Sequence, residues 1–283
     1  MSADPSRYCV VGNPVEHSRS PWIHARFAGL TGEAVAYGRQ LVALDAFAAD
    51  VRAFAAGGGR GCNVTVPFKF EAAALADRLT DRARIAGAAN TLRFENGEVH
   101  ADNTDGVGLL RDIEDNARVP LAGRDVLLMG AGGAAAGVLG PLLGAAPKRL
   151  VVVNRTAERA ADLVKRHQAL ARLSGTVLEA VEIRRLDENF DVVVNATASS
   201  LAGTGIPVHH TVLRPGALAL DMMYGPAARV FLEWARGHGA VARDGLGMLV
   251  EQAAESFLYW RGVRPPSAVV LAELRAVVDG AAG

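Results

Sequence analysis

The chain has 283 residues, half of them hydrophobic, and its 30 basic side chains balance 30 acidic ones. This length is sufficient for two domains that each have a core of their own. The even charge argues against a nucleic-acid-binding or membrane-surface protein, because such proteins carry a basic excess or basic clusters.

The remaining composition indicates a reduced, metal-free protein of the cytoplasm. Cys9 and Cys62 lie in apolar stretches and are expected to be reduced core residues. The seven histidines show no ligand spacing, so no metal site is expected. No apolar signal segment is visible near the N-terminus. The uncharged stretch 126–147 contains several glycines and Pro141, so we interpret it as a strand, a turn and a helix and not as a membrane span.

The first 75 residues alternate predicted strands and helices. Strands are expected at 8–11, 35–42 and 61–66, and helices from Ser20, over 44–56 and from Lys69. This alternation predicts a mostly parallel sheet with helical crossovers. Further on, Asn96-Gly97 between two strand-like stretches predicts a type I′ hairpin.

The strand predicted at 61–66 has one apolar and one polar face. Alternation places Cys62, Val64 and Val66 on one face and Asn63 and Thr65 on the other, and Lys69 continues the polar side at a helix start. This pattern favours the wall of a small-molecule site. The alternative is an edge strand that ends in a solvated lysine.

Two further polar positions precede predicted helices. Ser20 before Pro21 predicts a helix N-cap, and Ser18 and Ser20 together could seat a carboxylate at that helix end. Asp105 precedes a helix expected from about Leu109, where it could act as a cap or as part of a site. We place a domain boundary here, which gives domains at 1–105 and 106–245 and C-terminal helices at 246–283 that are expected to return to the first domain.

The second domain contains a strand, a glycine turn, a helix and a second strand at 150–153. The turn follows the Gly-x-Gly-x-x-Ala pattern, in which the backbone approaches a pyrophosphate at the helix N-terminus. Its expected cofactor contacts are Gly130, Ala131, Gly132, Gly133 and Ala134. The pattern predicts a Rossmann-type dinucleotide-binding domain.

The end of the second strand indicates the nucleotide. Sites for NAD place a carboxylate there, whereas this chain has Asn154, Arg155 and Thr156, with Arg159 one turn later. Guanidinium groups would bind a 2′-phosphate, so the site is predicted to take NADP(H). The alternative is an ordinary solvated helix start. A later strand at 191–195 ends in a polar run at 196–200, which places Asn195 and Thr197 at the ligand-binding edge of the sheet.

Together these segments resemble the shikimate dehydrogenase family. The matching segments are 12–21, 63–69, 87–91, 102–106, the glycine turn, 154–156, 195–197, 221–224 and 245–252. They span nearly the whole chain in family order. One departure is Ala136, where many members carry an arginine, which would remove one positive charge near the cofactor.

The resemblance implies NADPH-dependent, reversible reduction of 3-dehydroshikimate to shikimate and assigns roles by motif. Lys69 and Asp105 would form the catalytic pair. The implied substrate contacts are Ser18, Ser20, Thr65 and Tyr224 at the carboxylate, Asn90, Asp105 and Gln252 at the ring hydroxyls, and Asn63 on the same polar face. The implied cofactor contacts, besides those above, are Met222, Gly245, Met248 and Asp81.

Two alternatives remain. A quinate/shikimate dehydrogenase, often linked to NAD, is disfavoured by Asn154 and Arg155. An NADP(H)-sensing protein without catalysis is disfavoured by the presence of Lys69, Asp105 and Gln252. The expected partner is a small-molecule substrate, with no nucleic acid or membrane, and both a monomer and a homodimer fit the sequence.

Overall fold

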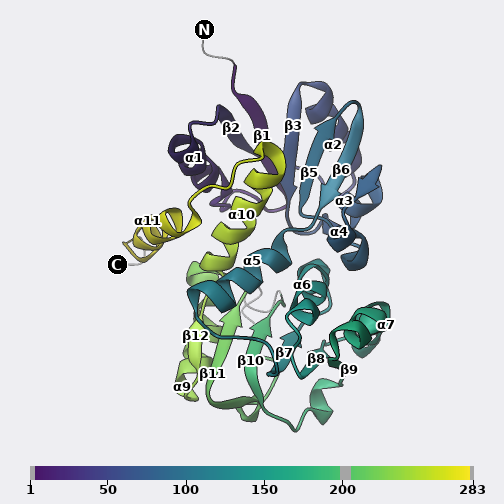
Figure 1. Cartoon of the computed structure of the whole chain (residues 1–283), viewed down its shortest axis with the longest axis vertical. Coiled ribbons are helices and arrows are strands. Elements are labelled where there is room, and N and C mark those ends of the chain that lie inside the picture. Colours follow the sequence, from purple (N-terminus) through teal and green to yellow (C-terminus); the bar gives the residue numbers. More distant parts are fainter. Residues whose placement is uncertain (1–3, 198–204, 281–283) are drawn as a thin grey trace. The chain divides into compact units, whose positions relative to one another are not determined.

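A computed structural model describes residues 4–197 and 205–280, so the end of the polar run at 196–200 lies outside the described residues. The chain forms two compact units (Figure 1). The first contains Met1–Gly108 and Val250–Gly283, and the second contains Leu109–Leu249. The division falls after Gly108 and Leu249, a few residues later than the boundaries after Asp105 and Gly245 expected from the sequence.

The first unit is an α/β unit with a mixed, mainly parallel arrangement of strands. Its strands are β1 (Ser6–Gly12), β2 (Val35–Leu41), β3 (Gly59–Val64), β4 (Arg78–Leu79), β5 (Thr91–Glu95) and β6 (Glu98–Asp102). Its helices are α1 (Ser20–Thr31), α2 (Phe47–Ala56), α3 (Lys69–Leu75), α4 (Asp81–Ala86), the start of α5 (Asp105–Arg111), most of α10 (Leu246–Arg261), and α11 (Ser267–Gly280). The sheet order is β2-β1-β3-β5-β6-β4. Strand β1 pairs in parallel with β2 and β3, and β5 is antiparallel to β3 and β6.

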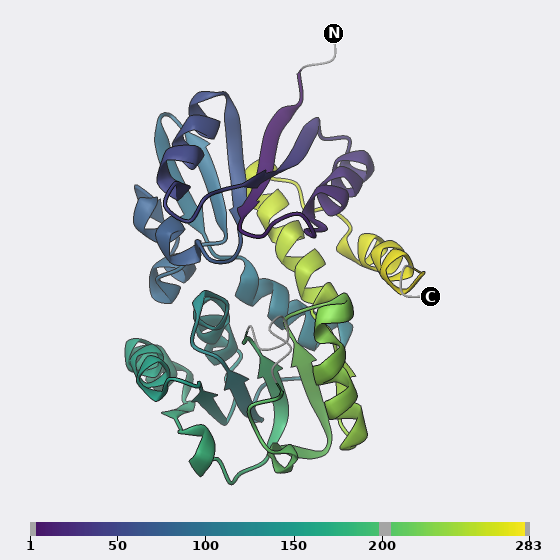
Figure 2. The ribbon, with the colours of Figure 1, turned by 180° about the vertical axis from the view of Figure 1, so that it is seen from behind.

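Both faces of this sheet are buried because β1 alternates between two apolar layers. Cys9 packs in a cluster with Phe47 of α2 and with Phe68, which precedes α3. On the other face, Tyr8 stacks on Trp260 of α10 with the ring centroids 4.5 Å apart. The C-terminal segments α10 and α11 therefore belong to the core of this unit, beside the β1 and α1 segments from the start of the chain (Figure 2).

Three local expectations in this unit were wrong. Val66 is 53% exposed and not on a buried face, because β3 ends at Val64 before the alternation reaches it. Helix α2 begins at Phe47, and Leu44, expected inside it, is exposed. Helix α5 begins at Asp105 itself, about one turn before the expected start at Leu109.

The hairpin was predicted correctly. Strands β5 and β6 are joined by Asn96 and Gly97, which have φ values of 53° and 80°. Positive φ at both positions is the property of a type I′ turn, and asparagine and glycine tolerate it better than other residues.

The second unit is a parallel Rossmann-type sheet, as the sequence predicts. Its strands are β7 (Asp125–Met129), β8 (Arg149–Val153), β9 (Val177–Ala180), β10 (Phe190–Asn195), β11 (Leu213–Asp221) and β12 (Val241–Arg243). Its helical segments are η1 (Asp112–Asn116), α6 (Gly133–Gly144), α7 (Ala157–Ser174), η2 (Ile183–Arg185), η3 (His210–Val212), η4 (Gly225–Ala228) and α9 (Arg229–Gly237). The sheet order β12-β11-β10-β7-β8-β9 is the dinucleotide-binding order 3-2-1-4-5-6 read from the other edge.

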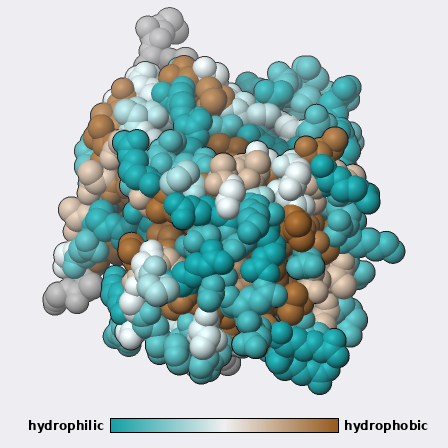
Figure 3. All heavy atoms as spheres, turned by 60° about the horizontal axis from the view of Figure 1, so that its bottom comes forward, coloured by the Kyte–Doolittle hydropathy of each residue, from teal (hydrophilic) through white to brown (hydrophobic). Residues whose placement is uncertain are grey.

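The strands of this sheet are apolar runs because helices cover them. Val126 and Leu127, neighbours that point to opposite faces of β7, are both fully buried. Helices α6 and α7 pack against each other, and α9 packs on β11 and β12. Across the described residues, no helix is both long and apolar enough to cross a membrane. Figure 3 shows hydrophilic and hydrophobic residues interspersed on one face of the molecule.

Candidate active site

Lys69 and Asp105 form a close ion pair in the first unit. Each is the first residue of a helix, α3 and α5 respectively. Lys69 Nζ lies 2.6 Å from Asp105 Oδ2, and the two side chains are only 14% and 6% exposed. A charged hydrogen bond this short, largely shielded from water, holds the ammonium group in a defined position.

Asn90 connects this pair to the rest of the predicted substrate site. Its Nδ2 donates to Asp105 Oδ1 at 2.8 Å and to Gln252 Oε1 at 3.2 Å. Its Oδ1 accepts from the backbone N–H of Thr104 at 2.8 Å, which fixes the orientation of the amide. Residues 69, 90, 105 and 252, predicted from four separate motifs, therefore meet in one buried network.

Ser18 and Ser20 lie together at the start of α1, but their hydrogen bonding differs from the prediction. The helix begins at Ser20, the cap position is Arg19, and no side chain caps the helix. Instead the Ser18 hydroxyl accepts the backbone N–H of Ser20 at 3.3 Å. The predicted capping role of Ser20 is therefore wrong, while Pro21 does occupy the first turn. Ser20 is buried and Ser18 is half-buried.

Asn63 lies on the face opposite Cys62, as the alternation predicts, but helices cover that face. Its Oδ1 accepts from Tyr37 Oη at 2.7 Å, and its Nδ2 donates to Ser256 Oγ at 3.0 Å and to Thr91 Oγ1 at 3.1 Å. The amide is thus satisfied by protein groups, and the contact of Asn63 with the substrate remains a prediction. Thr65 follows the strand and is half-buried.

The glycine turn of the second unit has the shape that a pyrophosphate needs. Gly130 has φ of 116°, and a Cβ there would lie 2.9 Å from the carbonyl oxygen of Ala196, so only glycine fits. Gly132 is the N-cap of α6, and a Cβ built on it would meet no atom within 4 Å. The first N–H groups of a helix have no partner within the helix, so the start of α6 suits an anionic group of a dinucleotide.

A hollow of about 390 Å³ lies at the end of β8. Its lining residues are Asn154, Arg155, Ala157, Glu182, Ile183 and Arg184. The Asn154 side chain donates to the carbonyl of Thr156 at 2.9 Å, which shapes the turn. Thr156 and Arg159 do not line the hollow, although both were predicted near it.

Glu182 and Arg184 were missed by the sequence interpretation. They follow β9, a short edge strand with three exposed residues out of four, which carried too little apolar signal to be predicted. The third strand that a Rossmann unit requires after α7 could have located them. Arg184 Nε donates to Glu182 Oε2 at 2.6 Å, and this hydrogen bond lowers the pKa of the Glu182 carboxyl.

Asn195, Met222 and Gly245 meet at one edge of the second sheet. Asn195 Nδ2 donates to Asp221 Oδ2 at 3.1 Å, and its Oδ1 accepts from Thr197 Oγ1 at 2.7 Å. A Cβ on Gly245 would lie 2.3 Å from the carbonyl oxygen of Met222, so this approach requires glycine. Met248 follows in the first turn of α10 and is buried.

Two predicted residues stand apart from these groups. Tyr224 belongs to the second unit, unlike the other predicted substrate contacts. Asp81 belongs to the first unit, where its side chain is 88% exposed and pairs with Arg84. The roles of both remain predictions.

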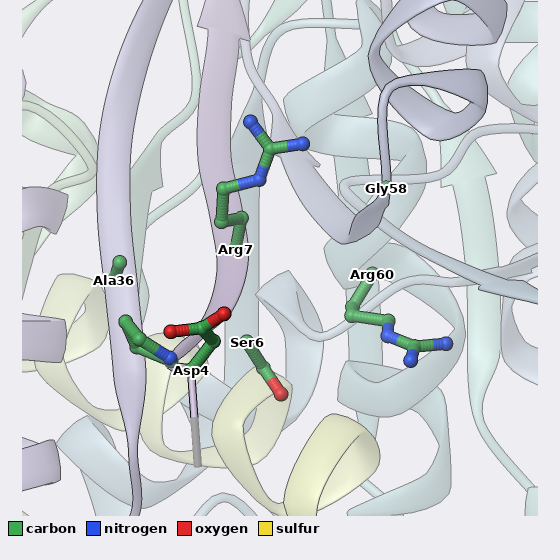
Figure 4. A pocket seen from close by; sticks show the side chains of 7 residues that line it. Asp4, Ser6, Arg7, Ala36, Gly58 and Arg60 are labelled. Atoms are coloured by element: carbon green, nitrogen blue, oxygen red, sulfur yellow. The ribbon is translucent and has the colours of Figure 1, made fainter. Parts of the chain in front are cut away.

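A second hollow of about 440 Å³ lies near the start of β1 and contains none of the predicted residues. In Figure 4 the guanidinium groups of Arg7 and Arg60 point apart, and Asp4 adds a carboxylate to the lining. These groups do not converge on one ligand. Within residues 4–197 and 205–280, no group of three or more His, Cys, Asp or Glu side chains is placed to hold a metal ion.

A dinucleotide-binding sheet and a buried Lys–Asp pair in a separate α/β unit define a dehydrogenase of the nicotinamide class. The chain matches "Shikimate dehydrogenase substrate binding domain" over residues 10–92, "Shikimate / quinate 5-dehydrogenase" over 113–204 and "Shikimate 5'-dehydrogenase C-terminal domain" over 245–275. It belongs to the shikimate dehydrogenase family.

Relatives and solved structures agree with this assignment. The shikimate dehydrogenase (NADP(+)) of Acidovorax sp. (strain JS42) is 65% identical over 282 residues, which cover 100% of both chains. The shikimate 5-dehydrogenase of Thermus thermophilus, solved with shikimate, is 30% identical with a TM-score of 0.83, covering 97% of this chain and 99% of that one. The Ael1 enzyme of Pseudomonas putida is 45% identical with a TM-score of 0.85, covering 95% and 98%.

Proposed function

We propose that this chain catalyses the reversible NADPH-dependent reduction of 3-dehydroshikimate to shikimate. The observation that carries the proposal is the Lys69–Asp105 pair, held at 2.6 Å and joined through Asn90 to Gln252. A keto acid with ring hydroxyls needs a cationic donor at the carbonyl and several neutral hydrogen-bonding groups around the ring, and this network supplies both.

The residues of the chain would provide positioning and charge. When bound, the nicotinamide supplies a hydride to the carbonyl carbon, which builds negative charge on the oxygen. Lys69 places a donor and a positive charge at that oxygen, which stabilises the transition state. Asp105 keeps the ammonium group aimed, and Asn90 holds the second oxygen of Asp105 so that the carboxylate cannot rotate.

The cofactor would lie on the second unit. The N-terminus of α6 and the turn from Gly130 to Ala134 would hold the pyrophosphate. The hollow lined by Arg155 and Arg184 would hold the 2′-phosphate, because guanidinium groups bind phosphate through paired charged hydrogen bonds. We also propose a cytoplasmic location, since Cys9 and Cys62 are both free and buried.

A turnover assay tests the proposal. Purified protein is assayed with shikimate or quinate and with NADP⁺ or NAD⁺. We expect shikimate with NADP⁺ to give the highest kcat/KM, with NADP⁺ preferred at least about tenfold, the scale of one good charged contact. Comparable turnover of quinate would make the chain a quinate/shikimate dehydrogenase, and nucleotide binding without turnover would make it a sensing protein.

A further inference from the structure

Arg39 is held against the loop that carries Ser18. Its Nη2 donates to the Ser18 carbonyl oxygen at 2.7 Å, and its Nε donates to the same oxygen at 3.1 Å. Two hydrogen bonds from one guanidinium to one carbonyl fix both groups. The Ser18 hydroxyl, in turn, is fixed by the backbone N–H of Ser20.

The position of Arg39 on its strand puts it at the ligand-binding edge of the first sheet. It pairs with Val10 in the parallel register of β1 and β2, two residues before β1 ends at Gly12. Ligands of parallel sheets lie at the carboxyl ends of the strands. Tyr37, two residues earlier and therefore on the same face of β2, already reaches Asn63 beneath the substrate site.

Within residues 4–197 and 205–280, no carboxylate pairs with Arg39, and its side chain is exposed. Two other charged side chains belong to the same loop. One is Glu16, whose carboxyl pKa is lowered by hydrogen bonds from its own backbone N–H and from that of Val15, the latter at 3.1 Å, so it is ionised at neutral pH. The other is Arg19, and because the formal charges of Glu16 and Arg19 sum to zero, Arg39 adds one positive charge beside this loop.

We propose that Arg39 is a specificity-determining residue that selects a negatively charged carboxylate over a neutral group beside Ser18 and Ser20. The inference rests on the proposed function and extends it. Two hydroxyls hydrogen-bond more strongly to a carboxylate than to an ester carbonyl, but both ligands satisfy them and the hydroxyls carry no net charge of their own. A guanidinium anchored beside them discriminates between the two, because its attraction to an anion has no counterpart for a neutral ligand.

The test compares shikimate with its methyl ester, which keeps the ring and removes the charge. Steady-state kcat and KM are measured with NADP⁺ for the wild type, Arg39→Gln, Arg39→Lys and, as a control, Arg52→Gln. Gln can still donate to the Ser18 carbonyl, so this variant removes the charge and keeps one hydrogen bond. Arg52 is an exposed arginine on α2 of the same unit, so its removal matches the loss of overall charge.

We expect Arg39→Gln to raise KM for shikimate about three- to tenfold, with kcat and the KM for the ester within about twofold, as suits one partly exposed charge. Arg39→Lys should keep most of the preference for the acid, and Arg52→Gln should match the wild type. An equal rise in KM for acid and ester in Arg39→Gln would overturn the proposal, because that result indicates a purely structural contact. An unchanged KM for both compounds would also overturn it.

Two further outcomes keep the test decisive. If Arg39→Gln does not fold, as judged by circular dichroism, Arg39→Lys decides alone, and loss of the acid preference in that variant overturns the inference. If the wild type turns over neither compound, the proposed function fails. Isothermal titration calorimetry of the protein, first with shikimate and then with its methyl ester, tests the charge preference of Arg39 separately from catalysis.

Discussion

At the scale of single residues, the proposed chemistry depends on the Lys69–Asp105 pair. The two side chains come from different helices and are 2.6 Å apart, with Asn90 fixing the second oxygen of the carboxylate. Because each of the three side chains is held by another, their contributions to kcat are not expected to be independent. Removing one side chain should therefore remove most of the contribution that the three make together.

Lys69→Ala should lower kcat by about 10²–10⁴-fold, the range typical of a lost acid–base group. The KM for shikimate should change far less, because the loss falls on the transition state. Asp105→Asn should also lower kcat, and the double variant should lose much less than the product of the single effects. Steady-state kinetics check this. A kcat within about threefold of wild type in Lys69→Ala would mean that the ion pair with Asp105 has a structural and not a catalytic role.

Arg184 provides a second residue-scale prediction, at the nucleotide. It pairs with Glu182 in the lining of the hollow, so Arg184→Ala would leave a bare carboxylate at the proposed site of the 2′-phosphate. KM for NADP⁺ should rise about three- to tenfold, while KM for NAD⁺ stays nearly unchanged. The matched control is Arg185→Ala, an exposed neighbour that does not line the hollow. Equal effects of the two substitutions would show a general charge effect instead of a site.

At the scale of elements, the strands were predictable where both faces are buried. The apolar runs of β7, β8 and β10 and the Asn96-Gly97 turn needed no tertiary information. The sequence-based predictions failed where tertiary contacts decide where an element begins or ends and which face is covered. Val66 is exposed because its strand ends early, and Ser20 is not a cap because it is already the first residue of α1, with Arg19 at the cap position. Sequence spacing likewise could not show that the polar face with Asn63 is covered by α10, since Ser256 lies 193 residues away.

The helix α1 carries an element-scale prediction through His24. This residue is fully buried, stacked on Tyr37 with centroids 4.2 Å apart. Burial lowers its pKa from 6.5 to about 3, opposed only in part by the neighbouring Asn63. Between these values the unfolded chain takes up a proton that the folded chain does not, so stability should fall as pH decreases from about 6.5 towards about 3.

Urea unfolding of the wild type and of His24→Phe at several pH values tests this effect. The variant should show a shallower loss of unfolding free energy with acid, by up to about 1.4 kcal/mol per pH unit. The pKa of His167, in the second unit, is also lowered by burial, so part of the slope should remain. Parallel slopes for the two proteins would mean that His24 is protonated in the folded state.

At the scale of the whole molecule, the chain leaves the first unit at Gly108 and returns to it at Val250. The returning segment supplies Gln252 to the site and Trp260 to the core. Its C-terminal helix is fastened by Arg26, whose guanidinium binds both carboxylate oxygens of Glu273 at 2.7 Å. The proposed substrate site is therefore complete only after the last part of the chain has been added to a sheet built from the first part.

The last prediction concerns the contact that joins these two parts. Trp260 Nε1 donates to the carbonyl oxygen of Leu92 at 2.9 Å, and its ring stacks on Tyr8. Trp260→Phe keeps an aromatic ring but leaves that part-buried carbonyl without its donor, which should cost about 1–3 kcal/mol of unfolding free energy. Trp22→Phe is the matched control, because Trp22 lies on α1 of the same unit and its removal breaks none of the hydrogen bonds named above. Urea unfolding followed by circular dichroism measures both. Because α10 also carries Gln252, the KM for shikimate should rise in Trp260→Phe and stay unchanged in Trp22→Phe. If Trp260→Phe is as stable as the control, the hydrogen bond from Trp260 to Leu92 does not contribute to holding the returning segment on the sheet.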